Sequence, residues 1–147
     1  MQRVSTIFAT ALVLVASAAI AQDKKAGDEM KAGGEMKKTT MILTGTIVDT
    51  KCYAMSADNI TDQHGDMPGC GAACANMGVP VGVVKDGRKG DPAVILLAPA
   101  KSFASVMGKT VRVSGTSTWN GAALIPDKVE VKDDKGNWSP IKVKSMM

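Results

Sequence analysis

The residues best suited to metal or redox chemistry lie together in one short part of the chain. Cys52, His64, Cys70 and Cys74 follow one another with the spacing C-x11-H-x5-C-x3-C, and they include all three cysteines and the single histidine of the sequence. Three thiolates and one imidazole can form a four-coordinate zinc site, and fewer of the same ligands can hold Cu(I). We therefore predict a metal site with these four residues as ligands.

The cysteines also admit two other kinds of chemistry. In an oxidising compartment Cys52 can pair with Cys70 or with Cys74, and such a disulfide would staple a long loop and leave one free thiol. A bridge between Cys70 and Cys74 is less favourable on a regular helix, because their Cα–Cβ bonds run parallel. Thiol redox chemistry is the third alternative.

The beginning of the chain has the features of a secretory signal. Arg3 precedes an apolar run, and Ala19 and Ala21 occupy the small-residue positions of a cleavage site. We predict a signal peptide at residues 1–21 and a periplasmic or secreted protein, without stable membrane insertion after cleavage. The charged residues that remain form no basic cluster, which argues against a nucleic-acid partner.

Residues 22–40 differ in composition from the rest of the chain. They contain the near repeat KAGDEM and KAGGEM, and they have no branched aliphatic or aromatic side chains before the threonines at their end. Ordering such a segment costs conformational entropy that no core compensates. We predict a flexible linker, in which Met30 and Met36 have a possible second role as thioether ligands.

Residues 41–147 have the alternating and β-branched patterns of a small β domain. The strands are predicted at Thr44–Val48, Val81–Lys85, Val94–Leu97, Lys109–Gly115 and Lys128–Val131, with a helix at Ala100–Met107. In the fourth strand Val111 and Val113 should be buried and Arg112 should face outward. Pro126 indicates that the last strand is bulged or lies at an edge. This element order is that of a five-stranded OB-like Greek-key barrel with a helix between strands three and four.

The cysteines and the histidine fall in an insertion between the first two predicted strands, at residues 50–78. In GCGAACANMG the alanines and Gly78 favour a short helix, on which Cys70 and Cys74 share one face. Cys52 is expected at the end of the first strand. The three sulfur atoms should then converge at the mouth of the barrel, with Met55, Met67 and Met77 available as auxiliary soft ligands.

Several of these motifs together resemble a known group of proteins. These motifs are, in chain order, TGTIVDTKCY, a histidine, the C-x3-C pair, GVPVGVV and GKTVRVSGT. Their combination is similar to that of small exported bacterial domains of uncharacterised function that have an OB-like barrel. The resemblance covers about Ile42 to Val131. The matching positions are Cys52, His64, Cys70, Cys74, Gly78 and Pro80. The resemblance implies the fold and export, and it implies no substrate.

Two classes of function follow from the sequence. The first is an exported metal-binding protein that uses Cys52, Cys70, Cys74 and His64, with Cu(I) preferred over zinc because thiolates and thioethers are soft ligands. The second is a disulfide-stapled barrel that binds an envelope protein without a metal. The chain has none of the CxxCH, C-x-x-C or G-x-S-x-G motifs, and we do not predict an enzyme.

Overall fold

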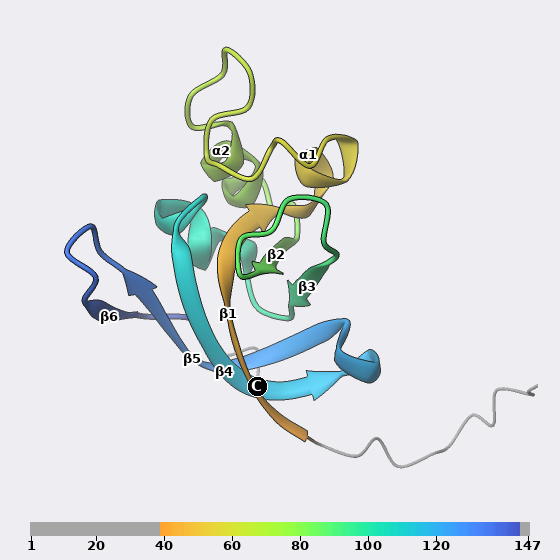
Figure 1. The fold of residues 1–147 in the computed structure, drawn as a ribbon, viewed down its shortest axis with the longest axis vertical. Coiled ribbons are helices and arrows are strands. Elements are labelled where there is room, and N and C mark those ends of the chain that lie inside the picture. The colour runs from red at the N-terminus through yellow and green to blue at the C-terminus, as the bar shows by residue number, and fades with distance from the viewer. Residues whose placement is uncertain (1–38, 145–147) are drawn as a thin grey trace, which may run out of the picture. The chain divides into compact units, whose positions relative to one another are not determined.

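The computed structural model describes residues 39–144 of the chain (Figure 1). The predicted signal peptide and all but the last two residues of the predicted linker lie outside this range. The strands are β1 (Thr39–Asp49), β2 (Val81–Lys85), β3 (Ala93–Leu96), β4 (Thr110–Thr118), β5 (Ala123–Lys132) and β6 (Trp138–Ile141). The helices are α1 (Thr50–Met55), α2 (Cys70–Asn76) and the 3₁₀ helices η1 (Ala100–Val106) and η2 (Trp119–Gly121).

Five of the strands close into the predicted barrel. β1 pairs antiparallel with both β2 and β4, β2 pairs with β3, and β4 pairs with β5. A short parallel pairing of β3 with β5 completes the circle. This is the strand arrangement of an OB-like Greek-key barrel, so the predicted fold class is confirmed.

The alternation of side chains along the strands explains why the barrel has a closed core. Val111 and Val113 of β4 are fully buried, together with Ile47 of β1 and Phe103 of η1. Arg112, between the two valines, faces outward and forms an ion pair with Glu130 of β5 at 2.9 Å. The predicted inward and outward positions of β4 are therefore confirmed.

The barrel departs from the prediction in three local features. The predicted helix between β3 and β4 is present as a 3₁₀ helix; it ends at Val106, one residue before the predicted end, and Gly108 has a left-handed backbone conformation. β5, the last strand of the barrel, starts at Ala123 and not at the predicted Lys128. Its pairing with β4 shifts between Ser114 and Gly115, opposite Pro126, so the predicted bulge is present. The additional strand β6 pairs with β5 and was not predicted.

The insertion between β1 and β2 contains two short helices that lie near one end of the barrel (Figure 1). Cys52 was expected to end the first strand, but β1 ends at Asp49 and Cys52 lies within α1. The reason is that the Asp49 side chain caps a new helix immediately after the strand. α2 was predicted, and its Ala75 belongs to the barrel core.

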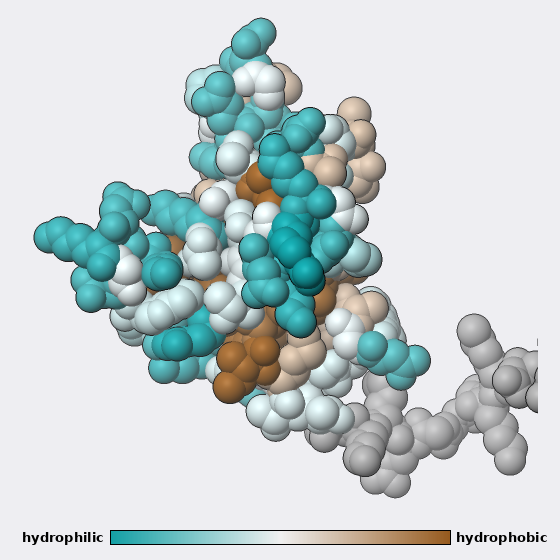
Figure 2. All heavy atoms as spheres, viewed as in Figure 1, coloured by the Kyte–Doolittle hydropathy of each residue, from teal (hydrophilic) through white to brown (hydrophobic). Residues whose placement is uncertain are grey.

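The surface carries charges of both signs. On the face shown in Figure 2, hydrophilic residues cover much of the loop between β2 and β3 and of the turn between β5 and β6. Several of these charges are paired, for example Arg88 with Asp91 at 3.0 Å and Lys89 with Asp58 at 2.8 Å. Within residues 39–144, none of the helices has the length and apolar character needed to cross a membrane.

Candidate metal centre

Asp49 sets the position of Cys52. It is the last residue of β1 and the N-cap of α1, and its Oδ1 accepts a hydrogen bond of 2.8 Å from the backbone N–H of Cys52. An aspartate in this position satisfies a free N–H of the first helical turn. The start of α1 is also attached to the residue that precedes β2, because the backbone N–H and the hydroxyl of Thr50 both donate to the carbonyl of Pro80. Cys52 is thereby held beside the end of the barrel.

His64 is held in the loop between α1 and α2, with only 5 % of its surface exposed. Two backbone hydrogen bonds with Met67, of 3.2 and 3.1 Å, fix its main chain. Its Nε2 lies 2.9 Å from the carbonyl oxygen of Thr61. A carbonyl oxygen only accepts, so Nε2 donates in this contact; when Nε2 alone carries a proton, Nδ1 has a free lone pair.

Cys70 and Cys74 lie one turn apart on α2, and Asp62 fixes this helix. The Asp62 Oδ1 accepts a hydrogen bond of 2.7 Å from the backbone N–H of Ala72. The Asp62 carbonyl accepts a second one, of 3.1 Å, from the N–H of Gly71. These bonds attach the first turn of α2 to the loop that carries His64. The predicted common face of the two cysteines is consistent with their positions, since both sulfur atoms lie near Cys52.

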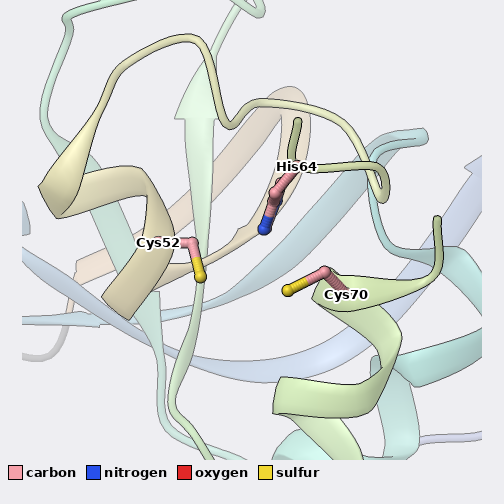
Figure 3. A group of neighbouring side chains, drawn as sticks. All are labelled: Cys52, His64 and Cys70. Carbon is pink, nitrogen blue, oxygen red and sulfur yellow. The ribbon is translucent and has the colours of Figure 1, made fainter. Parts of the chain in front are cut away.

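The candidate donor atoms form two sets that have Cys52 in common. The first set is Cys52, His64 and Cys70, and the second is Asp49, Cys52 and Cys74; within each set the donor atoms lie within 4.8 Å of one another. Figure 3 shows the first set, in which the three side chains point toward one another from α1, the loop and α2. The predicted convergence of the three sulfur atoms is confirmed, and the cysteines are free thiols.

Two polar atoms at this centre are buried and lack a hydrogen-bond partner among the described residues. They are Oδ2 of Asp49 and Nδ1 of His64. The Asp49 Oδ2 lies 3.5 Å from the His64 Nε2, but the proton on that nitrogen is directed to the closer Thr61 carbonyl. A buried polar atom without a partner carries a desolvation cost, which a bound cation would offset.

The environment keeps two of the thiols protonated. The pKa of Cys52 is raised to about 12, mainly by burial and in smaller part by the Asp49 carboxylate and the Cys74 thiol. Burial also raises the pKa of Cys74, again with a contribution from the charge of Asp49. A thiol with a raised pKa is a poor nucleophile at neutral pH. The same carboxylate that disfavours a thiolate would favour a cation in contact with both groups.

Asp49 is the donor that sequence reasoning missed. The strand pattern that ends beside Asp49 indicates only a carboxylate at a strand end, but this side chain is fully buried. The available signal was its position three residues before Cys52, since an aspartate at this spacing caps a helix and thereby fixes the orientation of the cysteine. Met55, Met67 and Met77 are 77, 60 and 75 % exposed, so they do not fill the core.

Comparisons of the chain with family models, with curated proteins and with solved structures find no match. The centre is therefore interpreted from its own geometry.

Proposed function

We propose that the protein is an exported metal-binding protein whose centre is formed by Cys52, His64, Cys70 and Cys74 together with Asp49. The observation that carries this proposal is the pair of buried atoms without partners, Asp49 Oδ2 and His64 Nδ1, beside three free thiols. Folded proteins rarely leave such atoms unsatisfied, and all five side chains are ordinary metal ligands. Export is supported by the signal-like segment at residues 1–21.

Zinc fits the donors better than Cu(I). The sequence favoured Cu(I) because it shows soft sulfur ligands, but the structure adds a carboxylate and presents one imidazole nitrogen. Zn²⁺ accepts thiolate, imidazole and carboxylate ligands, whereas Cu(I) prefers sulfur. Cu(I) is the second candidate, supported by the three thiols and by the exposed methionines of the insertion.

The number of donors favours a role in binding the ion tightly over a role in metal-dependent catalysis. A catalytic zinc has about three protein ligands and one open position for water or substrate. Here five potential donors surround the centre, and Asp49, His64 and Cys74 are buried. We propose that the protein stores, carries or senses the ion. The His64 Nε2–H bond to the Thr61 carbonyl would act as the outer-shell contact that orients the imidazole.

A disulfide is the alternative state of the same residues. The Cys52 sulfur lies within 4.8 Å of both other sulfurs, so a small movement would bring either pair into bonding distance. In an oxidising compartment a bound metal would protect the thiols from this reaction. Thiol counting on protein taken from its native compartment distinguishes the two states, because a disulfide leaves one free thiol and a metal site leaves three.

The proposal is tested by titrating the reduced full chain with Zn²⁺ against a chromophoric chelator. We expect Cys70→Ser to lower zinc affinity by at least about 100-fold, since loss of an outer-shell partner alone costs 10- to 100-fold. Ala73→Ser is the matched control, because it adds the same hydroxyl at an exposed position of α2 and should change nothing. His64→Ala should weaken zinc more than Cu(I), measured with a Cu(I)-specific chelator.

If the reduced wild-type protein binds neither ion more tightly than Cys70→Ser, the metal function is wrong. A single free thiol in the isolated protein would then support the disulfide-stapled barrel, with an envelope protein as its partner.

A further inference from the structure

We propose that the centre holds two divalent cations that share the thiolate of Cys52. This inference rests on the proposed metal-binding function and specifies its stoichiometry. One ion would bind Cys52, His64 and Cys70, and the other would bind Asp49, Cys52 and Cys74. These are the two donor sets that the geometry defines, each with its donor atoms within 4.8 Å of one another.

Each of the two donor sets contains a residue that has a buried atom without a partner. His64, whose Nδ1 lacks a partner, belongs to the set with Cys52 and Cys70. Asp49, whose Oδ2 lacks a partner while its Oδ1 accepts from the Cys52 N–H, belongs to the set with Cys52 and Cys74. A single ion in the first set would leave Asp49 Oδ2 unsatisfied. Two ions satisfy both atoms.

The charge of the ligands leads to the same stoichiometry. When all three cysteines bind as thiolates and Asp49 binds as a carboxylate, the ligands carry four negative charges. One Zn²⁺ in the first set would leave the Asp49 carboxylate without a cation in contact, although Asp49 is fully buried and Cys74 is 5 % exposed. Uncompensated charge in such a place is strongly unfavourable. Two Zn²⁺ ions neutralise the centre.

The binding step balances without a further reactant. Each thiol releases its proton to solvent as its sulfur binds zinc, and Asp49 binds as its carboxylate anion. The Cys52 sulfur uses two lone pairs, one for each ion. Metal ions that share a ligand in protein sites commonly lie about 3.5–4 Å apart, a separation compatible with two overlapping donor sets.

The experiment counts ions on the reduced full chain by native mass spectrometry, with elemental analysis of the same samples. A variant with Cys52, Cys70 and Cys74 all replaced by serine gives the number of ions bound outside the centre. Above that baseline we expect two Zn²⁺ for the wild type and one for Asp49→Asn. Asparagine keeps the oxygen that caps α1, so this variant removes the charge and retains the helix. The control Asp127→Asn removes a carboxylate from an exposed position of β5 and should keep two ions.

A second measurement tests the shared sulfur. With ¹¹³Cd²⁺ in place of zinc, two NMR resonances should appear and should show scalar coupling to each other through Cys52. One ion on the wild type would overturn the two-ion inference and leave the metal function intact. No ion above the baseline would overturn both. If Asp49→Asn binds two ions with unchanged affinity, the assignment of Asp49 to the second set is wrong. If the two resonances show no coupling, Cys52 does not bridge the ions.

Discussion

At the scale of single residues, the Asp49 carboxylate has two roles on its two oxygens. Oδ1 accepts from the Cys52 N–H and begins α1, and Oδ2 lies buried among the candidate ligands. The first role is local and follows from the sequence D-T-K-C, because aspartate is a favoured N-cap. The second role depends on His64 and Cys74, which come from distant parts of the insertion. Pattern reasoning therefore identified the cysteines and the histidine but missed this carboxylate.

The thiol pKa values predict how zinc binding depends on pH. In the metal-free protein the pKa of Cys52, raised to about 12 from an ordinary 9.0, keeps this thiol protonated throughout the neutral range. Zinc binds the thiolate, so binding displaces the proton, and each displaced proton makes the affinity rise tenfold per pH unit. We expect the affinity to rise at least about tenfold per unit from about pH 6 to pH 8, and to fall correspondingly on acidification.

Competition titrations at several pH values measure this slope directly. Calorimetry in buffers with different enthalpies of ionisation gives the number of protons released and serves as an independent check. Cys52→Ser should show a smaller slope than the wild type, because the displaced proton is absent. A zinc affinity that does not change over this pH range would contradict the proposed role of Cys52 as a ligand.

At the scale of elements, the sequence predicts the strands better than the connections between them. The β-branched and alternating runs of β1, β2 and β4 depend on burial in the barrel, which makes their pattern strong. α1 has only six residues and no amphipathic period, and its start depends on a side-chain cap. β6 contains Pro140 and has only Trp138 and Ile141 partly buried, so it gives little signal. The apolar spacing of η1 likewise does not distinguish a 3₁₀ helix from an α-helix.

Asp62 is the contact through which one element positions another at the centre. It accepts hydrogen bonds from the N–H groups of Ala72 and Gly71, which join α2 to the loop of His64. We expect Asp62→Ala to lower the free energy of unfolding by about 1 kcal/mol and to weaken zinc binding, because Cys70 would lose its fixed position. Zinc titration and chemical denaturation of the same preparations measure the two effects.

Two matched variants separate this positioning role from a general effect of charge. Asp62→Asn keeps an acceptor oxygen for the Ala72 N–H and should restore most of the zinc affinity. Asp66→Ala removes an exposed carboxylate from the same loop and should have no effect. If Asp66→Ala weakens zinc as much as Asp62→Ala, the loss reflects the charge of the loop and not the position of α2.

At the scale of the whole molecule, the barrel and the candidate centre depend on different interactions. The core contains Ile47, Val83, Phe103, Val113 and Leu124, all fully buried. The centre lies among the insertion helices, from which only Ala75 of α2 is fully buried in that core. A barrel of this kind needs no metal to bury its apolar side chains, unlike a small zinc finger. We infer that metal binding orders the insertion on a barrel that is already folded.

Removal of the metal tests this separation. The reduced protein treated with a chelator should keep a cooperative melting transition and its β-sheet circular dichroism. Zn²⁺ at a free concentration of about 100 times Kd should raise the free energy of unfolding by about 2.7 kcal/mol for each ion bound. Hydrogen exchange should slow on zinc binding in α1, the His64 loop and α2, because a cation joins these segments. Exchange in β4 and β5 should stay the same, since their hydrogen bonds are already closed within the barrel. The variant with Cys52, Cys70 and Cys74 all replaced by serine should show neither change. If the chelator unfolds β4 and β5 as well, the metal is part of the folding core, and the barrel does not stand without it.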